Sequence, residues 1–293
     1  MPMHPAAPQG LPDLVTAFAD TLQAVIDLGR SCSMEDLSRP TECPGWTVHD
    51  QISHVVGVEA WLEGHKDPRV QMPPYEHIRN DLGKKVEYAV EVRRGRRSAE
   101  VVAELEDVLA QRLSTLRRPG LTDTSIIPGP FGPDQATTVL LLRTFDVWVH
   151  EQDIRAAIGR PGDLDSPAAT VVVNSVLLQL PKLIARGAAL EPGHSVVIDV
   201  TGPVMARQGV RVEVDEQGHP RGHAMFSTGA EVPGDGSHAS DQEPGPAPMI
   251  ISLSTEDFTR RAAGRRSVSD TTYSVMGDEA IARRVLEALV VTH

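Results

Sequence analysis

The sequence is poor in the residue types on which several classes of protein depend. Only two of its 293 residues are cysteines, Cys32 and Cys43, and they form no CxxC pair, which fits a reducing cytosol better than a disulfide scaffold. Aromatic residues make up 4%, and no apolar run approaches the ~18 residues that a membrane-spanning helix needs. The N-terminus has no basic region followed by an apolar stretch, so we expect no signal peptide and predict a cytoplasmic protein.

Positive charge is also scarce, because the formal net charge is −12. An acidic protein repels a phosphate backbone at long range, so we expect neither a nucleic-acid partner nor a membrane partner. The basic cluster RRGRR at residues 93–97 is the one local exception, and it fits a solvated helix end. At 40% apolar residues, the chain can bury a core and fold unaided.

Helical apolar spacing dominates the first 160 residues. One of these helices begins after Thr47, where Asp50 three residues on completes a capping box. The predicted helices are residues 13–29, 48–65, 75–94, 98–118 and 140–158. Amphipathic helices of this length with short connections predict an up-and-down four-helix bundle.

The last 130 residues have a different pattern. After a further helix at about 167–186, strand-like runs begin near residues 195, 209, 223 and 248, and two helical segments close the chain. The polar, Gly- and Pro-rich stretch at 229–247 is predicted to be a mobile loop. We therefore predict two domains: a helical bundle over residues 1–163 and a smaller α+β domain over 164–293.

The segment LLLRTFDVWVHEQDIRAAIGRPG, residues 140–162, is the most informative. It looks buried, yet Asp146, His150 and Asp153 follow one stripe, with Arg143 just before them. Residues four apart share a helix face, so Asp146 and His150 could bind one metal ion, with His54 of an earlier helix as third ligand. A structural network, in which Arg143 pairs with Asp146, is the alternative. A zinc-protease motif is excluded, because HEQDI lacks the second histidine of HExxH.

Two stretches carry a resemblance to a known family. CPGWTVHDQISHVVGVEAWL together with RTFDVWVHEQDIRAAIGRPG resembles the N-terminal domain of the mycothiol-dependent maleylpyruvate isomerase family, which belongs to the wider DinB-like metal-binding bundles. The stretch HIRNDLG at 77–83 is similar to a recurrent segment of that family. The C-terminal run FTRRAAGRRS … VMGDEAIARRVLEAL resembles its sterol-carrier-protein-2-like (SCP2-like) second domain.

The resemblance implies that His54, Asp146 and His150 bind a divalent metal, usually zinc. The family more often has Glu at the position of Asp146, whose side chain is one methylene shorter, which alters its reach to the metal. Enzymes of the family use mycothiol, a cysteine-bearing pseudodisaccharide. The implied partners are therefore this small thiol and a small electrophilic substrate, in a protein expected to be a monomer or a weak homodimer.

A metal with an open position can hold a thiol as thiolate, which adds to an electrophilic double bond. Departure after bond rotation gives cis–trans isomerisation, whereas retention gives S-transfer, and the same ligands support both. An anionic substrate would need arginines, for which Arg79 and Arg265 are the candidates. Asp153 is predicted to accept a hydrogen bond from His150. The alternative function is a non-catalytic ligand-binding or regulatory protein with the same two domains.

Overall fold

The computed structural model describes residues 3–225 and 247–292 of the chain. The chain divides into two compact units, Pro8–Val171 and Val172–His293, and the N-terminal segment Met1–Ala7 joins the second unit. The division falls within helix α7 (Pro167–Gly187), whereas the sequence suggested a boundary between residues 163 and 164, in the loop before this helix. A continuous helix thus leads out of the first unit into the second.

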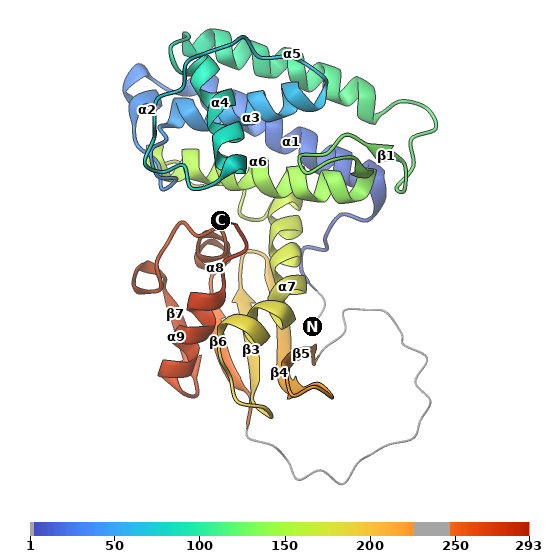
Figure 1. Ribbon diagram of the computed structural model, residues 1–293, viewed down its shortest axis with the longest axis vertical. Helices are drawn as coiled ribbons and strands as arrows, with labels where there is room; N and C mark the ends of the chain where they lie inside the picture. The colour runs from blue at the N-terminus through green and yellow to red at the C-terminus, as the bar shows by residue number, and fades with distance from the viewer. Residues whose placement is uncertain (1–2, 226–246, 293) are drawn as a thin grey trace. The chain divides into compact units, whose positions relative to one another are not determined.

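The first unit is a helical bundle (Figure 1). Its helices are α1 (Gly10–Ser31), α2 (Met34–Ser38), α3 (Val48–Leu62), α4 (Asp81–Arg94), α5 (Ser98–Leu116) and α6 (Ala136–Ile158). Helix α1 contacts α5 and α6, and α3 also contacts α5 and α6, so these four helices close around one core. Helix α4 packs on the outer side of α3. The predicted helical bundle is confirmed.

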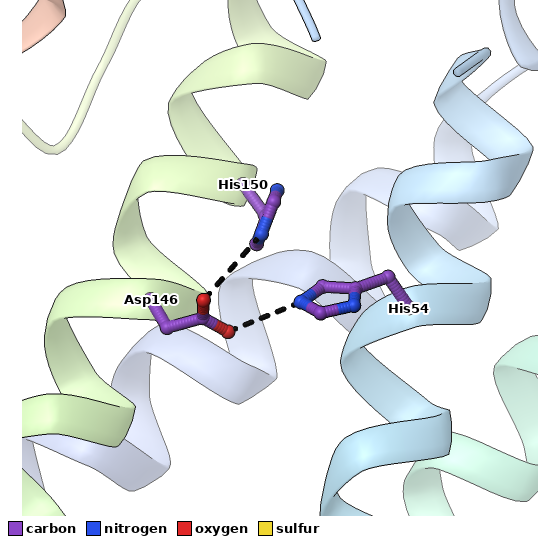
Figure 2. A group of neighbouring side chains, drawn as sticks. All are labelled: His54, Asp146 and His150. Atoms are coloured by element: carbon purple, nitrogen blue, oxygen red, sulfur yellow. Dashed lines mark hydrogen bonds and ion pairs between the residues drawn. The ribbon is translucent and has the colours of Figure 1, made fainter. Parts of the chain in front are cut away.

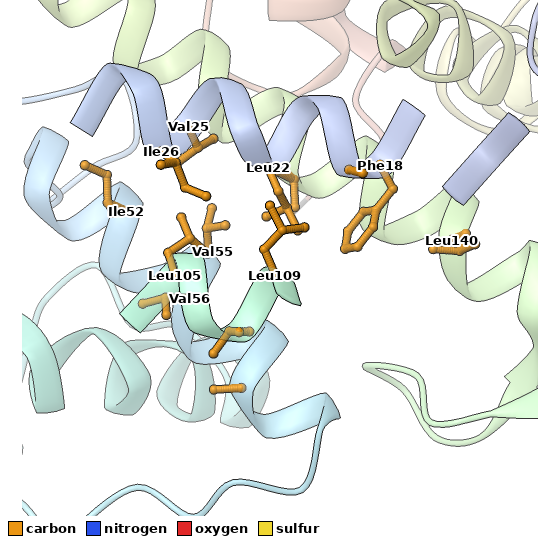
Figure 3. Close-up of a cluster of buried hydrophobic side chains, with 14 of the residues drawn as sticks. Phe18, Leu22, Val25, Ile26, Ile52, Val55, Val56, Leu105, Leu109 and Leu140 are labelled. Atoms are coloured by element: carbon orange, nitrogen blue, oxygen red, sulfur yellow. The ribbon is translucent and has the colours of Figure 1, made fainter. Parts of the chain in front are cut away.

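The bundle core is apolar and is built from all four long helices (Figure 3). Phe18 and Leu22 of α1 and Leu105 of α5 are fully buried, as expected for the apolar stripe of an amphipathic helix. Helices α1 and α5 approach closely at Gly29, where an added Cβ would lie 2.7 Å from Cγ2 of Val102. Burial of these side chains is the main stabilising contribution to the bundle.

The starts of three helices show where local sequence signals were sufficient and where they were not. The capping box of Thr47 and Asp50 is present, and α3 begins directly after it. The helix predicted from residue 75 instead begins at Asp81, because the Asn80 side chain accepts a hydrogen bond from the Gly83 amide and caps it there. Helix α6 begins at Ala136, four residues earlier than position 140.

A short hairpin, absent from the sequence prediction, precedes α6. Strands β1 (Ile126–Ile127) and β2 (Asp134–Gln135) pair antiparallel, with Ile126 opposite Gln135. They enclose the loop PGPFGP, residues 128–133, and β2 runs directly into α6. Strands of two residues are too short to give a period-2 pattern, so this hairpin left no signal in the sequence.

The second unit is an α+β domain with a five-stranded sheet, which confirms the predicted class. Its strands are β3 (Ser195–Thr201), β4 (Met205–Val214), β5 (Pro220–Ala224), β6 (Met249–Leu253) and β7 (Tyr273–Met276), in the order β5-β4-β3-β6-β7. Only the β3–β6 pair is parallel. Helices α8 (Thr255–Ala262) and α9 (Glu279–Ala288) complete the described part of this unit with α7 and a short 3-10 turn.

The strands at the two edges of the sheet, β5 and β7, differ from the sequence prediction. The strand expected from residue 223 is β5, which begins at Pro220 and ends at Ala224, and β7 was not predicted at all. The loop predicted at 229–247 lies, except for its last residue, outside the residues that the structure describes. The SCP2-like character of the unit stays a prediction.

Helix α7 is the one helix in the described ranges that is long and apolar enough, by length and composition, to cross a membrane. The sequence reading had noted no apolar run of that length. Of its most apolar window, 61% is buried inside the protein, as in the core helix of a folded domain. This helix therefore gives only weak evidence for a membrane partner.

Candidate metal centre

Helices α3 and α6 bring His54, Asp146 and His150 together (Figure 2). The Nε2 atom of His54 lies 3.2 Å from Oδ2 of Asp146, and the Nε2 atom of His150 lies 3.6 Å from Oδ1 of the same carboxylate. One potential ligand atom from each residue lies within 4.8 Å of the others. Asp146 and His150 converge because they are four residues apart on α6, and His54 meets them from the facing helix.

The orientation of His150 is set by α3. Its Nδ1 atom lies 2.5 Å from the amide oxygen of Gln51 and 3.4 Å from a carboxylate oxygen of Asp153. The Gln51 amide nitrogen donates to Asp153 and to the Thr41 hydroxyl, which fixes the amide so that its oxygen faces the ring. Both neighbours of Nδ1 are acceptors, so Nδ1 carries a proton and Nε2 is the ring nitrogen that faces Asp146.

His54 is held by packing as well as by Asp146. The ring of Trp46 lies 5.0 Å from that of His54 and 5.8 Å from that of His150, measured between centroids. The Trp46 indole N–H donates to Glu87 at 2.8 Å, which fixes the ring in place. The Nδ1 atom of His54 is buried with no hydrogen-bond partner among the described residues. The tryptophan of the CPGW stretch thus forms one wall of the cluster.

The charges of the cluster depend on one another. Burial alone would raise the pKa of Asp146, but the nearby Arg143, His54 and His150 hold it well below its usual range. Burial and the charge of His150 lower the pKa of His54 to about 4. Burial would also lower the pKa of His150, but the carboxylates of Asp146 and Asp153 reverse this and raise it. A carboxylate between two imidazoles is therefore anionic and suited to a cation.

A buried ion-pair network supports Asp146; the sequence offered its Arg143–Asp146 pair as an alternative, but not its extension to Glu59 and Arg112. Arg143 donates to Oδ2 of Asp146 at 2.9 Å and to Glu59 at 2.7 Å. Glu59 also accepts from Arg112 of α5 at 2.9 Å, and Arg112 reaches Glu63. The Glu59 side chain is fully buried. The side chains of Arg112 and Arg143 are only 1% and 3% exposed. A lone acid in the apolar run of α3 was the available signal for Glu59.

The cluster borders a cavity of about 360 Å³. His54, Asp146 and Arg143 line one part of it, and the rest is formed by further residues of α3, α4 and α6, by residues 65–67 and by the β1–β2 loop. Arg79 does not line this cavity; it is exposed in the segment before α4. Arg265 follows α8 in the second unit, where its guanidinium donates to the carbonyl of Ala263. The substrate-binding roles suggested for these two arginines stay predictions.

The donor set fits a divalent metal. Two imidazole nitrogens and one carboxylate, with space beside them, are the arrangement of catalytic zinc sites, which keep a fourth position for water or substrate. The buried Nδ1 of His54, which lacks a partner, does not oppose this, because Nε2 is the atom that faces Asp146. The amide oxygen of Gln51 accepts a hydrogen bond from His150, and Arg143 donates one to Asp146; partners of metal ligands commonly hold them in this way.

Comparison with known proteins agrees with the geometry. Residues 15–155 match the protein-family model described as "Mycothiol maleylpyruvate isomerase N-terminal domain". No curated protein matches the sequence. Among solved structures, a mycothiol-dependent maleylpyruvate isomerase variant with one histidine replaced by alanine is similar at a TM-score of 0.51 and 16% identity, over 90% of this chain and 92% of that chain.

The structure of the mycothiol-dependent maleylpyruvate isomerase itself also matches, with a TM-score of 0.47 over the same shares of the chains. At 16% identity the first of these likenesses shows a shared fold over nearly the whole chain. The family match covers the three clustered residues His54, Asp146 and His150. Residues 15–155, which lie within the N-terminal helical unit, are thus similar to the mycothiol maleylpyruvate isomerase N-terminal domain.

Proposed function

We propose that the protein is a divalent-metal enzyme that uses mycothiol to attack a small electrophile, as an isomerase or as an S-transferase. The observation that carries the proposal is the convergence of His54, Asp146 and His150 at the edge of a cavity. The family match and the fold shared with a mycothiol-dependent isomerase support the choice of thiol.

Three residues would bind the metal, and two others would hold these ligands in place. His54 and His150 would each offer Nε2, and Asp146 one carboxylate oxygen, to the metal, which we take to be zinc. When bound, a divalent metal of this kind stabilises a thiolate near neutral pH. Gln51 holds the ring of His150, and Arg143 holds the carboxylate of Asp146 so that its second oxygen stays available. The cavity beside them would hold the acceptor and exclude water.

The two reactions differ only in whether the thiol stays on the product. In both, the thiolate sulfur forms a bond to one carbon of a conjugated double bond, and the electron pair moves to the substrate's carbonyl oxygen. Rotation followed by loss of the thiolate restores the double bond as its other isomer. Protonation of the adjacent carbon instead leaves a thioether. Arg143 is the buried cation in the cavity lining that could face the negative oxygen.

Elemental analysis of the purified protein tests the metal. We expect about one divalent metal ion per chain, most of it lost in His150→Ala. His49→Ala is the matched control, because His49 lies on α3 near His54 but outside the cluster, and it should keep the metal. Full metal retention in His150→Ala would refute the ligand assignment.

A thiol screen separates the reactions and the non-catalytic alternative. The protein is incubated with mycothiol and a panel of unsaturated carbonyl compounds. Isomerisation without loss of free thiol identifies an isomerase, and stoichiometric loss of thiol identifies an S-transferase. Turnover of no compound by metal-loaded protein would favour a ligand-binding or regulatory role. The cytoplasmic location and the monomeric or weakly dimeric state stay predictions.

A further inference from the structure

We propose that the cavity beside the metal cluster binds an amphipathic carboxylate, with its apolar body inside the cavity and its anionic group at the mouth. The cavity lies entirely within the helical unit. Its volume of about 360 Å³ suits one small organic molecule, since ligand pockets range from about 300 to 1,000 Å³.

The walls of the cavity are mostly apolar. Val58 and Trp61 come from α3, Val86 from α4, Leu142 from α6 and Phe131 from the β1–β2 loop. Trp61 is 39% exposed and Phe131 72%, although large apolar side chains usually avoid water. Leu82 of α4, which is 45% exposed, also lines the cavity. Exposed apolar side chains that gather around one hollow are typical of a ligand site.

The apolar walls favour the acceptor over the thiol as occupant. Mycothiol is a pseudodisaccharide whose hydroxyl groups need hydrogen-bond partners, and burying them against Val58, Val86 and Leu142 would leave them without any. An apolar ring or chain has no such cost and gains free energy from the water it displaces.

The mouth of the cavity carries positive charge in an acidic protein. Lys66 and Lys85 both line the cavity and are exposed. Within the described ranges neither lysine forms an ion pair with a carboxylate, and the ammonium of Lys85 lies 3.5 Å from the centroid of the Trp61 ring. The carboxylate of Asp67, also in the lining, is already paired with Arg93 at 3.0 Å. Asp146 is likewise held by Arg143.

These charges set the orientation of the ligand. Its carboxylate would lie near Lys66 and Lys85, and its body would extend past Trp61 toward His54 and Asp146 at the other part of the lining. The electrophilic carbon would then lie in the apolar body rather than next to the carboxylate. This reactive role rests on the proposed function, whereas the binding itself does not.

Isothermal titration with three probes tests the ligand class on the full-length protein. The probes are 4-phenylbutyrate, its neutral counterpart 4-phenylbutanol, and glutarate, an anion without an apolar body. We expect 4-phenylbutyrate to bind best, 4-phenylbutanol more weakly and glutarate not detectably. The advantage of the carboxylate over the alcohol should shrink in 0.5 M salt, because exposed ion pairs are screened. Equal binding of glutarate and 4-phenylbutyrate would overturn the proposal.

Two pairs of variants localise the site. Lys85→Gln should weaken 4-phenylbutyrate about 3-fold and leave 4-phenylbutanol unchanged, the effect of one exposed ion pair. Lys84→Gln removes the same charge from the same helix outside the cavity lining and should change neither probe. Phe131→Asp should weaken both probes at least about 5-fold. Ile126→Asp, an exposed change on the same hairpin outside the lining, should not.

The outcomes separate this proposal from the proposed function. If Lys84→Gln and Lys85→Gln weaken 4-phenylbutyrate equally, the effect is one of overall charge and the site assignment is wrong. Two results would overturn the ligand class without affecting the proposed metal site. In one, metal-loaded protein binds none of the probes. In the other, the Phe131→Asp variant binds the probes as well as the parent protein does. Protein that lacks metal but binds 4-phenylbutyrate with the expected variant pattern supports the ligand class and refutes the metal enzyme.

Discussion

The two faces of α3 belong to one helix, yet they differ in what they need from the rest of the chain. One face carries Ile52, Val55 and Val56, which pack into the apolar core with α1 and α5 (Figure 3). The other carries Gln51, which contacts His150 of α6, and His54, which contacts Asp146 of α6 (Figure 2 shows His54 and Asp146). The first face needs only apolar volume, whereas the second needs specific partners.

Glu59 connects the two faces. It lies four residues after Val55, on the side of the apolar core, yet its carboxylate binds Arg112 of α5 and Arg143 of α6. Buried charges are stable only when each has its partner, whereas apolar side chains tolerate a range of neighbours. We therefore expect changes on the core face to act on stability alone, and changes in the network to act on stability and on the metal.

The largest effect is expected for Glu59→Gln. Removing this charge leaves Arg112 and Arg143 buried with one fewer acceptor, at a cost of about 4 kcal/mol in the free energy of unfolding. Metal affinity should also fall, since Arg143 holds Asp146. Urea unfolding and metal titration measure the two effects. The control Glu100→Gln is on the exposed side of α5 and should stay within about 0.5 kcal/mol of the parent.

Leu105→Ala is the counterpart on the core side. Leu105 is fully buried, so the cavity left behind should lower the free energy of unfolding by about 3 kcal/mol. Metal content at room temperature should not change, because Leu105 belongs to the apolar core cluster, which contains none of the three proposed ligands. Leu141→Ala, on the exposed side of α6, is the control. If Leu105→Ala lost metal while it stayed folded, changes on the core face would not act on stability alone, and the expected difference between the two faces would be wrong.

Asp153→Asn tests whether the Asp153 carboxylate keeps the proton on Nδ1 of His150. The fully buried Asp153 carboxylate lies 3.4 Å from Nδ1 of His150 and accepts from Gln51, so its charge favours the protonated Nδ1 that leaves Nε2 for the metal. We expect metal affinity to fall ~10-fold, as measured by competition with a chelator. Asp165→Asn, an exposed change after α6, should have no effect. Unchanged affinity in Asp153→Asn would show that Gln51 alone orients the ring.

The smallest effect is a pH dependence at Glu87. Burial would raise the pKa of Glu87, but hydrogen bonds from His77, Trp46 and Arg94 lower it below its ordinary value of 4.5. Because the folded pKa is the lower one, the stabilisation is fully present above pH 4.5 and is lost as the pH falls through the folded value. Glu87→Gln should therefore flatten the decline of stability below pH 4.5, whereas the exposed Glu35→Gln should not.

Several features of the helical unit were predictable from the sequence because their cause is local. The capping box of Thr47 and the four-residue spacing of Asp146 and His150 depend only on the geometry of one helix. The start of α4 was missed by six residues, from 75 to 81, because the cap of Asn80 competes with a weak apolar pattern. The β1–β2 hairpin was too short to be recognised at all.

The candidate cluster was predictable in part. Its three members follow from the sequence and the family resemblance, and the structure brings His54, Asp146 and His150 within 4.8 Å. The bond between Arg143 and Asp146 follows from their spacing on one helix, and the sequence reading had offered it as an alternative to a metal. The structure has the Arg143–Asp146 bond and the cluster of His54, Asp146 and His150 together, because the guanidinium contacts only one of the two carboxylate oxygens.

The amino-acid sequence by itself determined the helices, their apolar stripes and which side chains share a face, because 3.6 residues per turn relates spacing directly to direction. The tertiary structure decided that Gln51 meets His150, that Glu59 takes both Arg112 and Arg143, and that a cavity opens beside His54. These pairs join helices far apart in the chain. Their register depends on how the packed cores of whole helices fit, which no local spacing encodes.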